Sequence, residues 1–320
     1  MKGIAVAGSA LVDEINIIPS YPERGKLVEI NSVSRNVGGL VPNVGIDLKR
    51  LNPDLDVYAY AKVGRDEKAE FLLGTLKNNG IDVRGITRSE LSGTSYTQVM
   101  SECGGERTFF SYSGACADFG YDDIDFDGID AEIFHLGYFL LLKKIDDGDG
   151  LKILKELSDR GIKTSIDLVS SVGGRYEKIL PCLPYVDYLI INEIEAAELC
   201  DEPNERNLRK LSEQLFSFGV RKCVIIHEQD KACLFDGKYR ETASLIVPTE
   251  LFRGKTGAGD AFCAGCLSEI CAGTSPDEIL ETGIRAAAAS IMSYGATDGV
   301  RTKKEIYEIT KDFGRRKLCL

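Results

Sequence analysis

The chain has 320 residues, 43% of them hydrophobic and 28% charged, which is enough to bury a substantial core in one large α/β domain or two smaller ones. The formal net charge of -11 argues against nucleic acid as the main partner, because phosphate backbones bind basic surfaces. No apolar run approaches the length of a membrane-spanning helix, and the ten cysteines are scattered through apolar segments, so we expect a cytoplasmic protein with reduced thiols and no membrane partner.

Short apolar runs alternate with helical patterns along the chain. We expect buried strands at residues 4–7, 57–63, 133–136, 163–167, 188–191 and 222–226. We expect helices at residues 41–51, 67–79, 151–160, 193–199, 208–218, 260–272 and 276–293. This alternation predicts an α/β fold with a mainly parallel sheet covered on both faces, which binds ligands at the carboxyl ends of its strands.

Two polar, extended segments interrupt this pattern at about residues 13–36 and 93–113. The second contains a candidate hairpin turn at residues 103–106, Cys-Gly-Gly-Glu, between two runs rich in aromatic and β-branched residues. We expect the two segments to form one small β-sheet beside the main domain, suited to act as a lid. Two independent surface hairpins are the alternative.

The most informative motif is residues 256–260, Thr-Gly-Ala-Gly-Asp, at the start of a predicted helix. The bare backbone of Gly257, Ala258 and Gly259 lets consecutive N–H groups face one spot, and the helix N-terminus adds partial positive charge there. Asp260 places a carboxylate beside this anion site, where it would serve as a base that takes a proton from an attacking hydroxyl. The alternative is a tight turn with Asp260 as the helix N-cap.

A second motif lies near the N-terminus. Adjacent Gly38 and Gly39 before a helix let a polyhydroxylated ligand approach the backbone, and Asp13 and Asn43 offer an acceptor and an amide for its hydroxyls. A turn followed by an N-cap would explain the same residues.

A third motif, residues 192–195, Asn-Glu-Ile-Glu, follows an apolar strand and opens a helix. Asn192 and Glu195 are placed to hold Mg²⁺ beside nucleotide phosphates, often through waters. Ordinary acidic charges in the first turn of a helix are the alternative.

The remaining metal-ligand types give weaker patterns. His135 and His227 lie in or at the end of apolar strands without a triad or metal-site pattern, so core or strand-end roles are favoured. Cys263 and Cys266 have CxxC spacing but no second pair, which favours helix packing over a metal or redox role.

With these three motifs in this order, the chain resembles the PfkB (ribokinase-like) family of carbohydrate kinases over nearly its whole length. The resemblance implies one domain over residues 1–320, a three-layer sandwich with a mainly parallel central sheet and a small β-sheet lid, and ATP-dependent phosphorylation of a sugar-like hydroxyl. It implies that Asp260 is the base and that the backbone of 257–259 forms the anion hole. It further implies sugar binding by Asp13, Gly38, Gly39, Asn43 and Asp260, Mg²⁺ placement by Asn192 and Glu195, and a homodimer paired through the lid.

The nucleotide side departs from the family pattern. Gly254 replaces an aspartate that helps to bind a monovalent cation, so we expect Lys255 or Arg253 to supply that charge and activity to be independent of K⁺. The turn at residues 227–231 lacks the family's two glycines, which leaves the nucleotide donor open. We expect ATP to contact residues on both sides of this region: Asn192, His227, Lys255, Thr256, Gly257 and Gly259.

The substrate stays open at this stage. A free sugar such as a ketohexose is the first expectation, since the glutamate of ribose-specific members is absent after residues 135–136. Arg107 in the lid, with Tyr96 and Tyr112, is suited to meet a phosphate or stack on a base, which keeps sugar-phosphate and nucleoside kinases as alternatives. The alternative from a different functional class is a non-catalytic, sugar-binding regulatory protein with the same fold.

Overall fold

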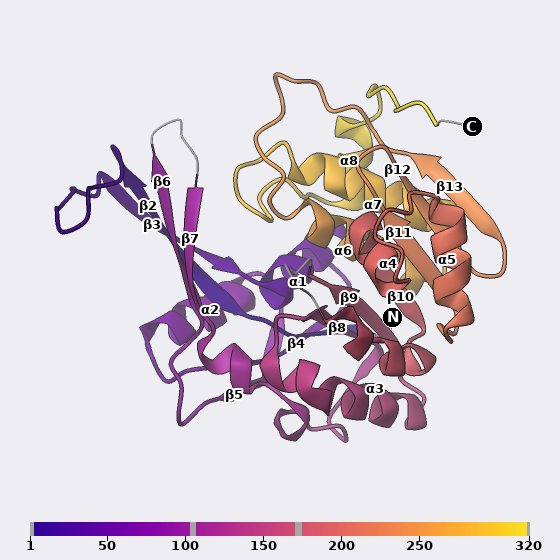
Figure 1. Ribbon diagram of the computed structural model, residues 1–320, viewed down its shortest axis with the longest axis horizontal. Helices are drawn as coiled ribbons and strands as arrows, with labels where there is room; N and C mark the ends of the chain where they lie inside the picture. The colour runs from indigo at the N-terminus through magenta and orange to yellow at the C-terminus, as the bar shows by residue number, and fades with distance from the viewer. Residues whose placement is uncertain (1–2, 103–106, 170–174, 319–320) are drawn as a thin grey trace.

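The chain forms two sheets of unequal size, seen in a computed structural model that describes residues 3–102, 107–169 and 175–318 (Figure 1). The large sheet has nine strands in the order β13-β12-β11-β10-β9-β8-β1-β4-β5, and neighbouring strands pair parallel except β11 with β12 and β12 with β13, which are antiparallel. Its strands are β1 (Gly3–Ala7), β4 (Val57–Val63), β5 (Asp82–Arg88), β8 (Ala131–Phe139), β9 (Lys163–Leu168), β10 (Tyr188–Asn192), β11 (Cys223–His227), β12 (Lys231–Phe235) and β13 (Tyr239–Ala243).

Helices cover both faces of this sheet. They are α1 (Leu40–Leu51), α2 (Glu67–Asn78), α3 (Gly150–Asp159), α4 (Glu193–Leu199), α5 (Leu208–Ser217), α6 (Ala258–Ala272), α7 (Pro276–Ser290) and α8 (Lys303–Ile309). Because successive strand residues point to opposite faces, Ile4 and Val6 pack in a core with α1, α2, α6 and α7, whereas Ala5 and Ala7 pack in a second core with α3, α4 and α5. This three-layer α/β arrangement around a mainly parallel sheet is the predicted architecture.

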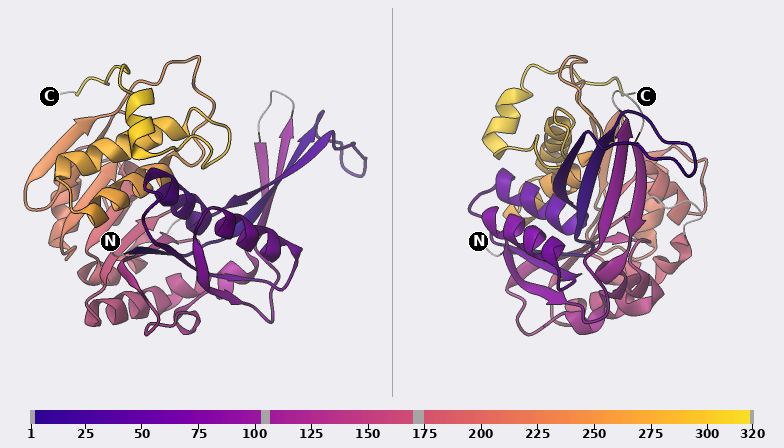
Figure 2. Two further views of the ribbon diagram at one scale, coloured as in Figure 1. Left: turned by 180° about the vertical axis from the view of Figure 1, so that it is seen from behind. Right: turned by 90° about the vertical axis from the view of Figure 1, so that its left-hand side faces the viewer.

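The small sheet has the order β3-β2-β6-β7 and projects from one side of the molecule (Figure 2). It consists of β2 (Leu11–Ile18), β3 (Ser32–Gly38), β6 (Tyr96–Glu102) and β7 (Arg107–Tyr112). The two polar segments therefore make one sheet, as predicted, joined by parallel pairing of β2 with β6 in which Asp13 lies opposite Thr97. The expected turn at 103–106 lies outside the described residues.

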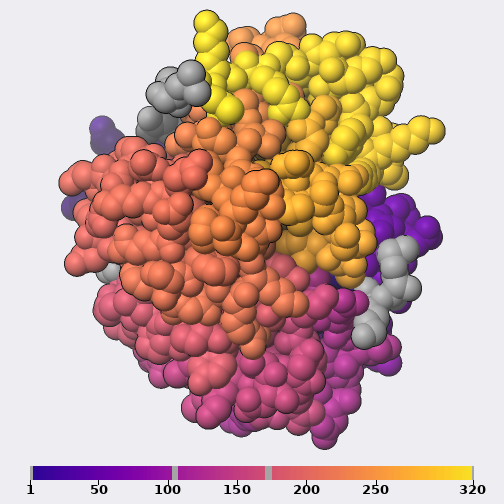
Figure 3. Space-filling view, turned by 90° about the vertical axis from the view of Figure 1, so that its right-hand side faces the viewer, coloured from indigo at the N-terminus to yellow at the C-terminus, as the bar shows by residue number. Residues whose placement is uncertain are grey.

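The opposite face of the molecule is formed by the middle and C-terminal parts of the chain (Figure 3). Four elements of the fold were not predicted from the sequence: β5, β12, β13 and α8. Strand β5 is half-buried at the sheet edge, so it lacks the continuous apolar run that marks a central strand. Helix α8 is short, although Thr302 and Glu305 form the capping box that signals its start.

The structure also bears on the expected state of the cysteines and on the expected lack of membrane-spanning helices. The cysteines in the described part of the chain are free thiols, and all but Cys271 are buried. Among the described residues, no helix has both the length and the apolar character needed to cross a membrane.

Candidate active site

Polar side chains gather where four neighbouring parallel strands end. Tyr138, Asp167, Asn192 and His227 lie at the carboxyl ends of β8, β9, β10 and β11, which is the edge where α/β sheets bind ligands. The N-terminus of α6 meets them there, and a cavity of about 300 Å³ is lined by all four residues together with Gly257, Gly259 and Asp260. The predicted base and turn therefore lie at the predicted edge of the sheet.

The two glycines of the turn differ in what they require. Gly257, the N-cap of α6, has a left-handed φ of 81°, and a Cβ there would lie 2.2 Å from the carbonyl oxygen of Ala296. A Cβ on Gly259 would meet only the His227 ring at 3.9 Å. Ala258 N–H donates to the carbonyl of Lys255 at 3.2 Å, so this N–H group of the turn already has a hydrogen-bond partner within the turn. Gly257 is needed by the fold, whereas Gly259 keeps backbone open to the cavity.

Asp260 is a buried carboxyl group inside a small hydrogen-bond network. Asn43 Nδ2 donates to its Oδ2 at 2.8 Å, and the Tyr138 hydroxyl lies 3.0 Å from both Oδ1 and Oδ2. Burial, and secondarily the negative charge of Asp167, raise the pKa of Asp260 to about 7. The alternative role as an N-cap falls to Gly257, so Asp260 lies within the first turn of α6.

Tyr138 was not predicted as a site residue. Its φ of 59° is in the left-handed region, which is uncommon for a bulky side chain and is found where the surrounding structure enforces it. Its N–H donates to Asp167 Oδ1 at 2.6 Å, which helps to hold the residue over Asp260. The sequence separation of 122 residues between Tyr138 and Asp260 explains why no local pattern reveals the pair. The sequence signal for Tyr138 is its place at the carboxyl end of a buried strand.

The N-terminal motif positions α1 against the base. Gly39, the N-cap of α1, has a φ of 87°, and a Cβ there would clash with Ser9. Ser9 in turn accepts hydrogen bonds from the first turn, Leu40 N–H to its Oγ and Val41 N–H to its carbonyl, both at 3.0 Å. This fixes Asn43 next to Asp260.

Asp13 lies at the root of the small sheet, close to Gly38. A Cβ on Gly38 would lie 2.4 Å from Asp13 Oδ2, so any larger residue there would displace this carboxylate. Burial raises the pKa of Asp13, and a hydrogen bond from Thr97 opposes that effect. Arg107 lies at the other end of the sheet: it starts β7, is exposed, and lies about 17 Å of strand away from Tyr112.

Asn192 and Glu195 form a capping box at the start of α4. Asn192 Oδ1 accepts from the N–H groups of Ile194 and Glu195 at 3.0 and 2.9 Å, and Glu195 Oε2 accepts from Asn192 N–H at 3.0 Å. Both residues therefore have a structural role in capping α4, which neither sequence interpretation included. Both residues also line the cavity that contains Asp260.

A larger cavity of about 530 Å³ also borders the turn at 257–259, and Asp260 is not among the residues that line it. It is bounded by α6, α7 and the turn between β11 and β12, and Lys255 and Gln229 lie at its edge with Nζ and Oε1 3.5 Å apart. His227 lines both cavities, and burial lowers its pKa to about 4, so it is a neutral ring; its centroid lies 4.7 Å from that of Phe262, with the two rings tilted by 43°. Thr256 is exposed in the turn. The apolar lining comes from Leu245, Val247, Phe262, Ile284, Ala288 and Ile291.

Residues 1–303 match the family described as pfkB family carbohydrate kinase. The chain belongs to the pfkB family of carbohydrate kinases. It is therefore an enzyme of the phosphotransferase class with an alcohol group as acceptor. Similar proteins include a ribokinase from Schizosaccharomyces pombe, 24% identical over 96% of this chain and 97% of the relative. A probable chloroplastic fructokinase-6 from Arabidopsis thaliana is 27% identical over 88% and 76%.

Solved structures share the fold. Ribokinase from Thermotoga maritima superposes with a TM-score of 0.83 at 21% identity, covering 98% of this chain and all of the other. Arabidopsis thaliana ribokinase, solved with ribose and ATP, gives a TM-score of 0.80 at 21% identity over 97% and 99%.

Proposed function

We propose that this pfkB-family enzyme transfers a phosphoryl group from ATP to a hydroxyl of a small free sugar, with Asp260 as the general base. The single observation that carries the proposal is the buried Asp260 carboxyl, held by Asn43 and Tyr138 at the glycine-rich N-terminus of α6. A carboxylate beside an anion site is otherwise unfavourable, and general-base catalysis gives it a purpose.

The network indicates which Asp260 oxygen meets the substrate. Oδ2 is bonded by both Asn43 and Tyr138, whereas Oδ1 is bonded by Tyr138 alone. We therefore place the acceptor hydroxyl at Oδ1, where it donates its proton as it attacks phosphorus. The raised pKa of Asp260, about 7, suits a base that works near neutral pH.

The phosphoryl group would lie over the turn at 257–259, where backbone N–H groups and the start of α6 stabilise the oxygens of the transition state. The remainder of ATP fits the larger cavity, whose apolar lining suits a base and whose edge carries Lys255. Thr256, Gly257, Gly259, Asn192 and His227 then lie along the phosphates, as the resemblance implies.

Mg²⁺ would be held near Asn192 and Glu195, largely through waters, because Asn192 Oδ1 already accepts two backbone bonds. A carboxylate in the phosphate-facing cavity suits this hard cation. When bound, Mg²⁺ neutralises negative charge on the phosphates. Sugar hydroxyls would meet Asp13, Gly38, Gly39 and Asn43 at the root of the small sheet, which serves as the lid. We further propose a cytoplasmic homodimer that pairs through this sheet.

The test is ADP release with MgATP across free sugars, sugar phosphates and nucleosides, with Asp260→Asn run beside the wild type. Turnover with one sugar that is lost in the variant supports the proposal. Preference for a phosphorylated sugar or a nucleoside would instead give Arg107 the substrate role considered above. ATP binding without turnover on any acceptor would contradict the catalytic assignment and favour a regulatory sugar-binding protein.

A further inference from the structure

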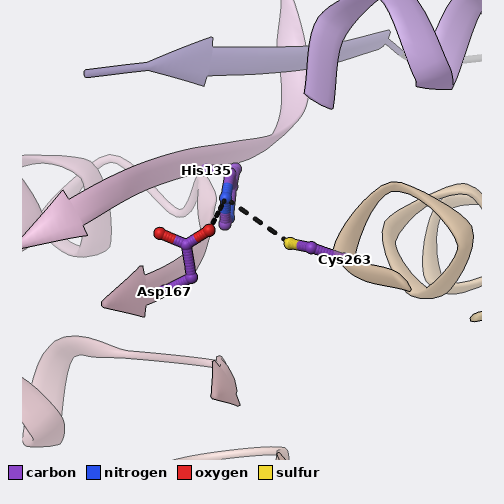
Figure 4. A group of neighbouring side chains, drawn as sticks. All are labelled: His135, Asp167 and Cys263. Carbon is purple, nitrogen blue, oxygen red and sulfur yellow. Dashed lines mark hydrogen bonds and ion pairs between the residues drawn. The ribbon is translucent and has the colours of Figure 1, made fainter. Parts of the chain in front are cut away.

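A buried cluster of three metal-ligand types lies beside Asp260, and none of its three side chains is assigned a contact with sugar or ATP in the proposed reaction. His135 on β8, Asp167 on β9 and Cys263 on α6 point toward one another, with one ligand atom of each within 4.8 Å of the others (Figure 4). The exposed fractions of the three residues are 0%, 7% and 2%. The sequence patterns favoured packing roles for His135 and Cys263, because nothing in the chain order shows that strands and helix bring them together.

The spacing within the cluster is close to that of a metal centre; the nitrogen–oxygen distance is long for a hydrogen bond, whereas the nitrogen–sulfur distance also suits a hydrogen bond to sulfur. His135 Nε2 lies 3.6 Å from Cys263 Sγ and 3.5 Å from Asp167 Oδ2. N–H···O hydrogen bonds in proteins fall at roughly 2.7–3.2 Å. Ligands around a tetrahedral Zn²⁺ have nitrogen–sulfur and nitrogen–oxygen separations of about 3.6 and about 3.4 Å, as follows from the usual bond lengths.

Neighbouring groups orient two of the three side chains in the way that metal ligands require. Ser165 Oγ lies 3.0 Å from His135 Nδ1, so Nδ1–H can donate to it and leave the Nε2 lone pair facing Cys263 and Asp167. Tyr138 N–H binds Asp167 Oδ1 at 2.6 Å, which leaves Oδ2 toward the histidine. Asp167 and Cys263 also line the smaller cavity, which provides an entry path and an open coordination position.

We propose that His135, Asp167 and Cys263 form a transition-metal site, with Zn²⁺ as the best chemical fit. A thiolate, a carboxylate and a neutral imidazole together balance the charge of a divalent ion, which favours a buried centre. The soft thiolate disfavours Mg²⁺ and Ca²⁺. Binding releases the thiol proton of Cys263 and forms metal–sulfur, metal–nitrogen and metal–oxygen bonds. The ion would link β8 and β9 to the helix that carries Asp260.

The test uses Co²⁺ as a spectroscopic substitute for Zn²⁺ on the full chain. Wild type should develop a thiolate-to-cobalt charge-transfer band that Zn²⁺ abolishes, and either ion should raise Tm. Cys266→Ser is the matched control, because Cys266 is buried three residues further along α6 and its Sγ faces the carbonyl of Ile279 at 3.7 Å instead. The control should keep the band, and Cys263→Ser should lose it.

Asp167→Asn is a second variant that leaves both sulfurs intact. It should weaken Co²⁺ binding at least about tenfold, since it removes the charged oxygen ligand. Absence of the band in folded wild type, or a band that Cys263→Ser retains, would overturn the proposal. These readouts need no sugar and no ATP, so they stand or fall separately from the kinase assignment.

Discussion

The two sides of the turn at 257–259 are built on different principles. On the proposed acceptor side, Asp260 is buried and held by side-chain hydrogen bonds from Asn43 and Tyr138. On the proposed nucleotide side, the larger cavity has mostly apolar walls, and Lys255, one of its charged lining residues, is exposed with its Nζ 3.5 Å from Gln229 Oε1. Function on the acceptor side therefore depends on a few side-chain hydrogen bonds, whereas nucleotide binding depends on the shape of the cavity and on backbone groups of the turn. Changes to single side chains should have larger effects on the acceptor side.

The largest effect is expected from Asp260→Asn. Loss of the base should lower kcat by about 10²–10⁴-fold. The same change should raise the free energy of unfolding at pH 8, by an amount on the order of 1–4 kcal/mol. The sign follows because the folded-state pKa of about 7 exceeds the unfolded value of 3.8, so folding stability falls as pH rises between them. Steady-state kinetics and thermal unfolding check both parts; an active or destabilised variant would contradict the assignment.

Gly259→Ala separates ligand access from folding. A Cβ at this position has room in the free protein but would intrude on the phosphoryl site, so kcat/KM should fall by about 10²-fold while Tm is unchanged or higher. Gly257→Ala is the matched comparison. It should lose both activity and stability, because of its φ of 81° and the clash with Ala296. Equal loss of Tm in the two variants would show that Gly259 is also structural.

Tyr138→Phe tests the hydroxyl over the base. It removes a hydrogen bond to a charged group, so kcat/KM should fall by about tenfold at pH 7. Since that bond lowers the pKa of Asp260, its loss should move the ascending limb of the kcat/KM profile above pH 7. The deficit should therefore be larger at pH 6 than at pH 9. A uniform loss at all pH values would mean that Tyr138 only shapes the pocket.

Lys255→Ala should have a smaller effect on the nucleotide side. An exposed charge contributes little, so KM for ATP should rise about fivefold with kcat nearly unchanged. The sugar KM provides the internal control and should stay constant. A large fall in kcat would place the Lys255 ammonium in the transition state and would remove the contrast between the two sides.

The smallest effect is expected from replacing K⁺ by choline. Gly254 offers no carboxylate for a monovalent cation, so kcat should change by less than about twofold. Kinetics at constant ionic strength check this. A strong K⁺ requirement would show that backbone carbonyls suffice to bind the ion.

The sequence predicted the central strands and most helices because each has a clear apolar period. For example, β4 (Val57–Val63) and α4 (Glu193–Leu199) begin and end at the predicted residues. It also predicted that Asp260 and its turn lie at the sheet edge. It did not predict Tyr138, which is hydrogen-bonded to Asp260, or Asp167, whose charge acts on Asp260, because both relations depend on how β8 and β9 pack against α6. Nor did it show that Asn192 Oδ1 accepts hydrogen bonds from two backbone N–H groups in the capping box of α4.

Gly39 is the covalent joint between the strand of the small sheet that ends at Gly38 and the helix that begins at Leu40. Gly39 has a left-handed φ, and Asn43 follows four residues later with its N–H bonded to the Gly39 carbonyl. If a sugar binds at Asp13 as proposed and displaces the small sheet, this short connection would carry the displacement to the amide that holds Asp260. Binding of the sugar and alignment of the proposed base would then be coupled through the backbone of a few residues.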